Sequence, residues 1–261
     1  MVLHDLFDSY GRQARLFPGL LTVFPPLLVI LAWFPALLIS NIGATLLTIA
    51  VSCGLFYALG SWARTRGKNI EPGLLAQWGG WPSTLVLRHS GPMQAATIAR
   101  YHGYLGKNVP HLSLPTPEDE RLDPKGADEA YASAVKWLKE KTRKGFPLIE
   151  KENAQYGFRR NLLGMRPVGI TLCAVAIGVS LLSVFGQALN FSTESALAAV
   201  SAKPSELWAA VGVNFVAMLG WIFVVNVEWV KQSGYQYADA LLAACDLLGT
   251  QTHSAAPRKT K

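Results

Sequence analysis

The stretch LFPGLLTVFPPLLVILAWFPALLISNIGATLLTIAVSCGLFYALGSWA, residues 16–63, contains no Asp, Glu, Lys or Arg. Residues 168–193 and 207–227 share this property. Each stretch exceeds the roughly 18 apolar residues that mark a membrane-spanning candidate, and the first is long enough for two helices. With the turn of the first stretch placed at Asn41 and Gly43, we expect four spans, near 17–38, 44–63, 168–190 and 207–229.

The composition agrees with a membrane protein. Only 16% of the residues are charged and 51% are hydrophobic, whereas about 25% of the residues of an ordinary soluble protein are charged. A cleaved signal peptide does not explain the first apolar stretch, because Asp5 and Asp8 precede the basic pair and the stretch is too long. The fold class expected is therefore membrane α-helical.

The basic residues predict the orientation of the spans. Of the 24 Lys and Arg residues, 23 lie in the N-terminal tail, in residues 64–166 or in the C-terminal tail, and Lys203 alone lies between the third and fourth spans. Basic residues are retained on the cytoplasmic side of a membrane. Both termini and the middle segment should therefore be cytoplasmic.

Five regions follow from this topology. They are an N-terminal amphipathic helix (1–15), a two-span hairpin (16–63), a mainly α cytoplasmic domain (64–166), a second hairpin (167–229), and a cytoplasmic amphipathic helix with a basic tail (230–261). The middle domain carries 17 basic and 10 acidic residues. No spacing of Cys and His residues suits a structural zinc site, and no cofactor is expected.

Within the middle domain, the Gly- and Pro-rich first part should be mostly turns, with residues 84–88 as a short strand. Helices are expected from Pro92 to about residue 105, from Asp128 to about residue 144, and from Pro147 through Arg166 almost into the third span. The second of these has a buried stripe of Tyr131, Val135 and Leu138. Near the C-terminus, an amphipathic helix should pack on the middle domain or on a neighbouring subunit, through Tyr237, Leu241, Leu242, Cys245 and Leu248.

The first span contains the pair Pro25–Pro26. Two prolines inside a helix remove two hydrogen-bond donors, so they should break or kink it. A kink in a gating helix is the functional interpretation. The alternative is that neighbouring groups satisfy the freed carbonyls, as is common in spanning helices.

Several residues of the middle domain suit the recognition of an anion. Guanidinium groups bind phosphate with two hydrogen bonds, imidazole adds a donor, and an aromatic ring can stack on a base. The candidates for binding a ligand or a partner are Arg88, His89, Arg100, His102, Tyr156, Arg159, Arg160 and Asn161. The structural alternative is that the arginines reach lipid headgroups and the histidines bind buried carbonyls.

Enzymatic motifs are weak. Ser90, His89 and Asp123 could form a triad, but the chain has neither a GxSxG motif nor a Walker A, GxGxxG or HExxH motif. The acidic run PEDER (117–121) is interpreted as a helix cap or a solvated turn. No catalytic residue is assigned.

One family of small bacterial proteins, with a cytoplasmic domain between two pairs of spans, is similar to this chain over roughly residues 75–170. The similarity lies in WGGWPSTLVLRHS (78–90), RYHGYL (100–105), LPTPEDERLDP (114–124), ADEAY (127–131) and FPLIEKENAQYGFRRNLLGMRPVG (146–169). The pattern ENxxYGFRRN is its most specific part.

The chain thereby resembles membrane effectors of anti-phage defence systems, such as the Hailong membrane effector and the four-span effectors of cyclic-oligonucleotide systems. The resemblance implies a tetrameric or similar channel in the bacterial inner membrane that stays closed until signalled. A nucleotidyltransferase partner or its oligonucleotide product would control it, and no binding of duplex DNA is expected.

Three functions remain open at this point. The first is an oligomeric membrane effector that conducts ions and senses a signal through its cytoplasmic domain. The second is a non-conducting membrane scaffold that recruits an enzyme. The third is a membrane enzyme with His89 or His102 as its base. In the first, residues 156–161 are the preferred coupling element, and Arg159→Ala with Arg160→Ala should abolish the response without preventing membrane insertion.

Overall fold

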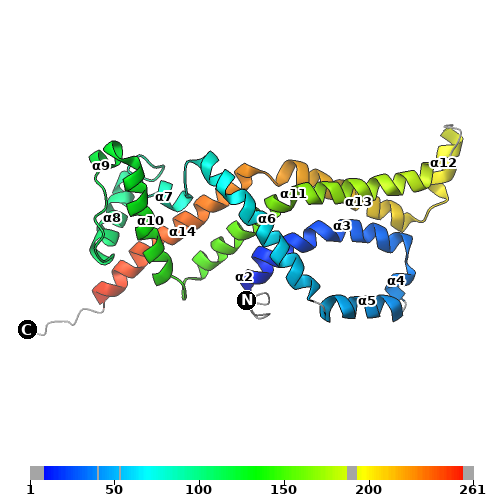
Figure 1. Cartoon of the computed structure of the whole chain (residues 1–261), viewed down its shortest axis with the longest axis horizontal. Helices are drawn as coiled ribbons and strands as arrows, with labels where there is room; N and C mark the ends of the chain where they lie inside the picture. Colours follow the sequence, from blue (N-terminus) through cyan, green and yellow to red (C-terminus); the bar gives the residue numbers. More distant parts are fainter. Residues whose placement is uncertain (1–8, 40, 53, 187–192, 255–261) are drawn as a thin grey trace, which may run out of the picture. The chain divides into compact units, whose positions relative to one another are not determined.

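The computed structural model describes residues 9–39, 41–52, 54–186 and 193–254, and these residues contain helices but no strand (Figure 1). The chain divides into two compact units: unit 1 is residues 1–71 with 157–229, and unit 2 is residues 72–156 with 230–261. Three helices contribute residues to both units, namely α6 (Leu55–Trp78), α11 (Pro147–Phe185) and α14 (Val227–Ser254). The predicted α-helical class is confirmed for the described residues.

Unit 1 holds the apolar helices. Besides parts of the three shared helices, it contains α2 (Ser9–Gly11), η1 (Arg12–Leu16), α3 (Phe17–Trp33), α4 (Ala36–Ile39), α5 (Asn41–Ser52), α12 (Thr193–Ser201), α13 (Ser205–Leu219) and η2 (Gly220–Val224). Among the described residues, Arg12–Trp33, Pro147–Phe185 and Ser205–Val224 are long and apolar enough to cross a membrane. Three of the four predicted spans thus have a suitable helix.

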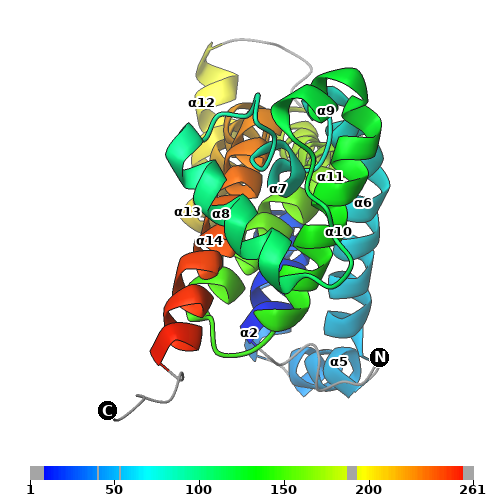
Figure 2. The ribbon, with the colours of Figure 1, turned by 90° about the vertical axis from the view of Figure 1, so that its left-hand side faces the viewer.

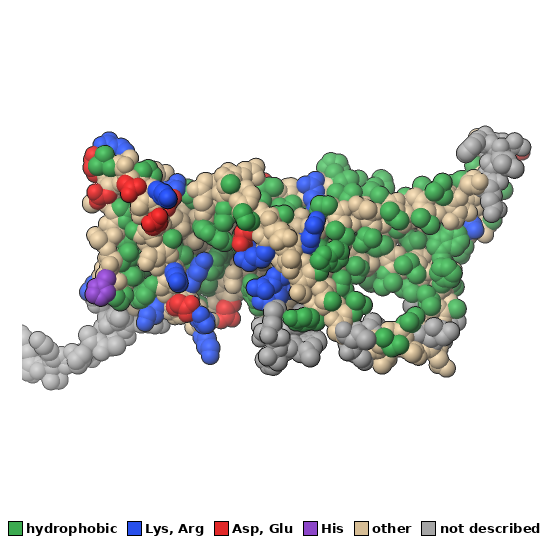
Figure 3. Space-filling model, in the orientation of Figure 1, with side chains coloured by type: hydrophobic (Ala, Val, Ile, Leu, Met, Phe, Trp, Pro, Cys, Tyr) green, Lys and Arg blue, Asp and Glu red, His purple; other side chains and the backbone are tan. Residues whose placement is uncertain are grey.

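The predicted second span is not one helix. The expected helix over 44–63 is divided between α5, which ends at Ser52, and α6, which begins at Leu55, with Gly54 in the left-handed region at φ 69°. The 12 residues of α5 correspond to about 18 Å, which is shorter than the hydrocarbon core of about 30 Å. Figure 3 shows an opening between α5 and α3, while α5 contacts α4.

The helix α3 packs along α13 within unit 1. It continues through Pro25 and Pro26, so the pair does not break the helix. The predicted kink at this pair stays a prediction. A separate apolar cluster of unit 1 includes Met165, Cys173 and Trp221. Gly169 lies against the indole of Trp221, where a side chain would collide with the ring. Close packing of small residues is a common way for apolar helices to associate without a hydrophobic driving force.

Two predictions for the start of the middle segment are wrong. Residues 64–78 are helical because α6 continues to Trp78, and residues 82–85 form the helical turn α7 (Pro82–Leu85) in place of a strand. Gly67 and Gly164 explain the first error. A Cβ on Gly164 would lie 2.5 Å from the carbonyl carbon of Arg66, so these glycines serve the close approach of α6 and α11 and do not mark turns.

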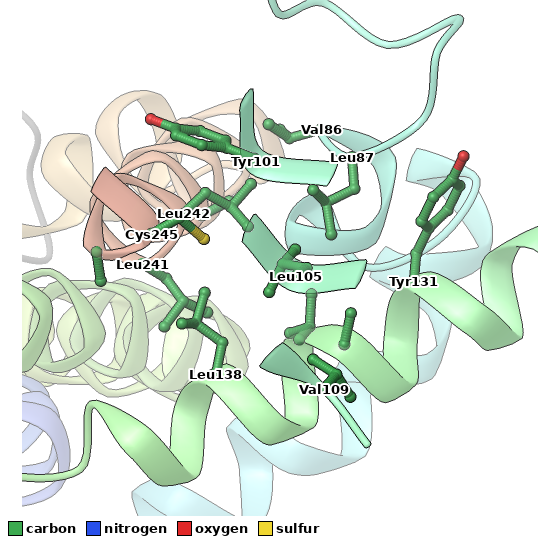
Figure 4. Close-up of a cluster of buried hydrophobic side chains, with 14 of the residues drawn as sticks. Val86, Leu87, Tyr101, Leu105, Val109, Tyr131, Leu138, Leu241, Leu242 and Cys245 are labelled. Atoms are coloured by element: carbon green, nitrogen blue, oxygen red, sulfur yellow. The ribbon is translucent and has the colours of Figure 1, made fainter. Parts of the chain in front are cut away.

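Unit 2 packs α8 (Ala95–Asn108) and α10 (Pro124–Lys141) against the C-terminal part of α14, which Figure 2 shows in a view turned by 90°. The predicted stripe of α10 is buried, and so are Leu241, Leu242 and Cys245 of α14. In Figure 4, Leu105, Leu138 and Leu241 come together from three helices. The predicted packing of the C-terminal amphipathic helix on the middle segment is confirmed.

Helix starts agree with local capping. α10 begins before the expected Asp128, because the carboxylate of Asp123 accepts from the backbone N–H of Gly126 at 3.0 Å. The short helix α9 (Pro117–Leu122) has a capping box between Thr116 and Asp119. The predicted helix from Pro147 is confirmed and continues past Pro167 to Phe185. The first eight residues of the predicted N-terminal helix and the basic tail from residue 255 lie outside the described residues.

Candidate functional site

The structure places the eight candidate residues in both units. Arg88, His89, Arg100, His102 and Tyr156 belong to unit 2, and residues 159–161 belong to unit 1. The boundary on α11 therefore falls inside the ENAQYGFRRN segment (residues 152–161).

Arg160 forms a buried ion pair with Glu71 of α6. The exposed fractions of the two side chains are 8% and 9%. Lys68 donates a second hydrogen bond to the Glu71 carboxylate at 2.7 Å. A buried charge is tolerated only when it is paired and hydrogen-bonded, so this pair fixes α11 against α6.

Asn161 extends this contact to the N-terminal segment. Its side-chain amide donates to the backbone carbonyl of Ala14 in η1 at 2.7 Å, and its side-chain oxygen accepts from Arg160 at 3.1 Å. Asn161 is 1% exposed. Since η1 leads directly into α3, Asn161 connects α11 to the helix that carries the proline pair.

Arg159 and Arg166 bind the segment where α13 gives way to α14. Arg159 donates to the carbonyl of Trp229 at 3.0 Å, and its Cζ lies 4.9 Å from the centre of the Trp229 ring. Arg166 donates to the carbonyl of Ile222 at 3.0 Å. Between them, the π-helical turn η2 ends and Asn226 caps α14 by accepting from the N–H of Trp229 at 2.9 Å. The two arginines thus bind carbonyls on either side of a helix discontinuity.

We call residues 159–161 with Glu71 the arginine brace. It joins α11 to η1, to α6 and to the start of α14, all within unit 1. The guanidinium groups of Arg159 and Arg160 therefore bind acceptors of the protein itself. The alternative from the sequence was that the arginines reach lipid headgroups, whereas the acceptors observed for Arg159 and Arg160 are a protein carbonyl and a carboxylate.

A second polar cluster lies in unit 2 around Glu120 of α9. The Glu120 carboxylate accepts from the backbone N–H of His89 at 2.7 Å, from the Ser90 hydroxyl at 2.8 Å and from the Tyr131 hydroxyl at 2.7 Å. Burial alone would raise the pKa of Glu120, but these hydrogen bonds outweigh it and lower the pKa to about 2. Burial and the bond to Glu120 raise the pKa of Tyr131. Glu120 is thus an ionised carboxylate that organises the chain around it.

The two predicted histidines meet beside this carboxylate. The rings of His89 and His102 pack edge-on with centroids 4.7 Å apart. Nε2 of His89 lies 3.1 Å from the carbonyl oxygen of Pro115, and Nε2 of His102 lies 2.8 Å from that of Leu87. A carbonyl only accepts, so Nε2 carries the proton in both rings. Burial lowers the pKa of His102, which favours its neutral form.

A pocket of about 490 Å³ opens beside the cluster. Its lining includes Arg88, His89, Ser90, Glu120 and Arg121. Arg88 forms a two-bond ion pair with Asp128, and Arg121 pairs with Glu118 at 2.6 Å. Arg100, by contrast, pairs with Asp246 of α14 on the exposed surface at 2.9 Å. The structure therefore brings Arg88, His89 and His102 together, while Arg100 is engaged elsewhere.

The proposed triad is not assembled in this cluster. The Ser90 hydroxyl donates to Glu120, and Asp123 caps α10. The contacts of His89 described above are with Glu120, His102 and Pro115, and none of them involves Ser90 or Asp123. Among the described residues, no group of His, Cys, Asp and Glu could hold a metal ion.

The proline pair has a hydrogen-bond partner in α13 that was not predicted from the sequence. Asn214 of α13 is fully buried, and its amide donates to the backbone carbonyl of Pro25 at 2.6 Å and to that of Ala210 at 2.9 Å. Its side-chain oxygen has no hydrogen-bond partner among the described residues. The contact places a polar group beside the two prolines, inside two of the helices that could cross a membrane.

No protein-family model, no curated protein and no solved structure matches this chain.

Two carboxylates were missed by sequence reasoning. Glu120 lies in the PEDER run, which was interpreted as a cap or a solvated turn, and Glu71 lies in a segment that was expected to be turns. A signal for Glu120 existed. Thr116 and Asp119 predict a helix start, and Glu120, four residues after Thr116, lies one turn into that helix and faces inward. No signal in the sequence pairs Glu71 with Arg160, because 89 residues separate them.

Proposed function

We propose that this chain is an oligomeric effector of the bacterial inner membrane, an ion channel or pore that is gated through unit 2. The observation that carries the proposal is the arginine brace. It holds η1, α6 and the start of α14 against α11, and two of these helices, α6 and α14, continue into unit 2, as α11 itself does. A change in unit 2 therefore has a covalent route to the residues that hold the apolar helices.

The proposal includes four spans with both termini in the cytoplasm. The second span would form from α5 and the first turns of α6 once a bilayer surrounds them. Two observations support this part: residues 16–63 have no charged side chain, and α5 exposes Leu46 and Ile49 with little packing of its own. The concentration of basic residues at the termini and in the middle segment supports the orientation.

Oligomer formation is proposed for a related reason. Exposed apolar side chains cover α3 and α13 on the face shown in Figure 3, and α5 leaves an opening that one chain does not fill. A bilayer or a second copy would cover these surfaces. The motif resemblance supports a tetramer or similar assembly.

The signal is proposed to be a nucleotidyltransferase partner or its oligonucleotide product, acting on unit 2. The resemblance to anti-phage effectors supports this part, and the pocket beside Arg88 and His89 offers a place for binding. The nearest charges in that pocket are already paired, so an anionic ligand would have to replace Asp128 or Glu118 as the partner of an arginine.

Potassium flux from vesicles tests the proposal. The full-length protein is reconstituted in phospholipid vesicles with a potassium gradient, alone and with a mixture of linear and cyclic oligoadenylates. We expect flux in one of the two conditions and none in protein-free vesicles. Absence of flux in both, with the protein shown to be inserted, would reject the channel and favour a non-conducting scaffold.

A further inference from the structure

A groove of about 630 Å³ lies between α3 and α13 in unit 1. Its apolar lining consists of Leu28, Leu31 and Ala32 from α3 and of Ala209, Ala210 and Val213 from α13. Both helices are among those long and apolar enough to cross a membrane. The groove therefore faces hydrocarbon and not water if the helices span a bilayer.

The size of the groove limits its occupant. A helix with its side chains is about 10 Å across, so this volume would hold only about one and a half turns of a helix from a second copy. A single lipid acyl chain is much thinner and fits along the groove. The small side chains of Ala32, Ala209 and Ala210 keep the space open.

Two opposite charges lie at one end of the groove. Glu206 is part of the lining, in the first turn of α13. Lys203 precedes the lining residue Pro204, and its Nζ lies 4.8 Å from the centre of the Trp33 ring at the end of α3. A tryptophan and a lysine at the end of an apolar helix are typical of the membrane–water interface.

We propose that the groove binds one acyl chain of an ethanolamine phospholipid. The phosphate of the lipid lies at Lys203 and its ammonium group at Glu206, so the zwitterionic headgroup is complementary to both charges at this end of the groove. The headgroup of phosphatidylglycerol would also place its phosphate at Lys203, but it has no ammonium group to offset the charge of Glu206. The lipid thereby lies next to the helix that carries Pro25 and Pro26.

Native mass spectrometry of the full-length protein tests the site. The protein is extracted in mild detergent from vesicles of equimolar phosphatidylethanolamine and phosphatidylglycerol, and retained lipid is counted per chain. We expect phosphatidylethanolamine to be retained preferentially. Val213→Phe should lower its retention roughly tenfold, because the ring fills the groove.

Val216→Phe is the matched control. Val213 and Val216 lie on the same helix with exposed fractions of 44% and 67%, and Val216 does not line the groove. Equal retention by the two variants would overturn the proposal. If Val213→Phe does not fold, as judged by its elution in detergent, Ala209→Phe takes its place.

Glu206→Gln tests the headgroup independently of the groove. Removing the negative charge should shift retention toward phosphatidylglycerol, while Lys203→Gln should lower the retention of both lipids. Wild-type protein that retains the two lipids equally, or an unchanged preference in Glu206→Gln, would contradict the assignment of the headgroup.

Discussion

Arg159 contacts Trp229 in two ways. Its guanidinium donates to the Trp229 carbonyl at 3.0 Å, and its Cζ lies 4.9 Å from the centre of the Trp229 ring. Trp229 is the third residue of α14, which continues into unit 2 and there contributes Leu241 and Leu242 to the core. A single side chain of α11 thus holds the start of a helix that belongs to both units.

The buried pair of Arg160 and Glu71 should be needed for stability. Arg160→Met leaves the Glu71 carboxylate buried beside Lys68 alone and should lower the free energy of unfolding by about 3–5 kcal/mol. The double variant Arg160→Met with Glu71→Leu removes both charges and should recover most of the loss. Thermal denaturation in detergent measures both. A single variant as stable as wild type would contradict the role of the pair.

The Glu120 cluster predicts an acid-sensitive stability. The pKa of Glu120 falls from its ordinary value of 4.5 to about 2 in the folded chain. A carboxyl with a lowered pKa stabilises the fold fully above its unfolded pKa and loses this contribution as the pH falls toward the folded pKa. The shift corresponds to about 3 kcal/mol, lost between about pH 4.5 and pH 2.

Glu120→Gln should remove this pH dependence and lower stability at neutral pH. Thermal midpoints measured from about pH 2 to pH 6 provide the test. Glu118→Gln is the control, because Glu118 is exposed and pairs only with Arg121 among the contacts of the structure. Identical pH profiles for wild type and Glu120→Gln would contradict the assignment.

The contact between Asn214 and Pro25 should stabilise the packing of α3 on α13. Hydrogen bonds between apolar helices contribute about 0.6–1.7 kcal/mol, so Asn214→Leu should lower thermal stability in detergent by a small amount of that order. Ser180→Ala is the control, since the Ser180 hydroxyl donates only within its own helix, to Ala176. A larger effect of the control than of Asn214→Leu would show that the contact is not specific.

The apolar helices were the most predictable part of the fold. Long uncharged stretches, helix starts such as Pro147, and the stripe of Tyr131, Val135 and Leu138 depend on local pattern alone. The predictions from the sequence were wrong where a tertiary contact overrides the local pattern. Gly67 was taken as a turn residue, although it lets α6 and α11 approach, and Pro25–Pro26 did not break α3.

The candidate site was only partly predictable for the same reason. The pairing of His89 with His102 involves side chains that are 13 residues apart on different elements, and both were selected by residue type. Residue type alone did not reveal that Arg88, Arg100 and Arg160 each face a carboxylate. Their partners, Asp128, Asp246 and Glu71, become visible only when the helices are packed.

Cysteine labelling tests the proposed four-span topology. Asn41→Cys and Ser195→Cys should react with a membrane-impermeant maleimide in intact spheroplasts, because both positions are placed outside. Arg143→Cys should react only after lysis, because the middle segment is placed in the cytoplasm. Labelling of residue 143 together with residue 41 in intact spheroplasts would mean that the segment from α5 to α6 does not cross the membrane.

Potassium flux from vesicles that contain wild type or Arg159→Gln tests the coupling role of the arginine brace most directly. Arg159→Gln removes both contacts with Trp229 and keeps the ion pair of Arg160 with Glu71, so the variant should insert normally. Arg166→Gln is the control, because it removes a hydrogen bond to a backbone carbonyl, that of Ile222, and leaves both contacts of Arg159 with Trp229 in place. We expect oligoadenylates to change the flux of wild type and of Arg166→Gln and to leave that of Arg159→Gln unchanged. An equal response in wild type and Arg159→Gln would contradict the coupling role.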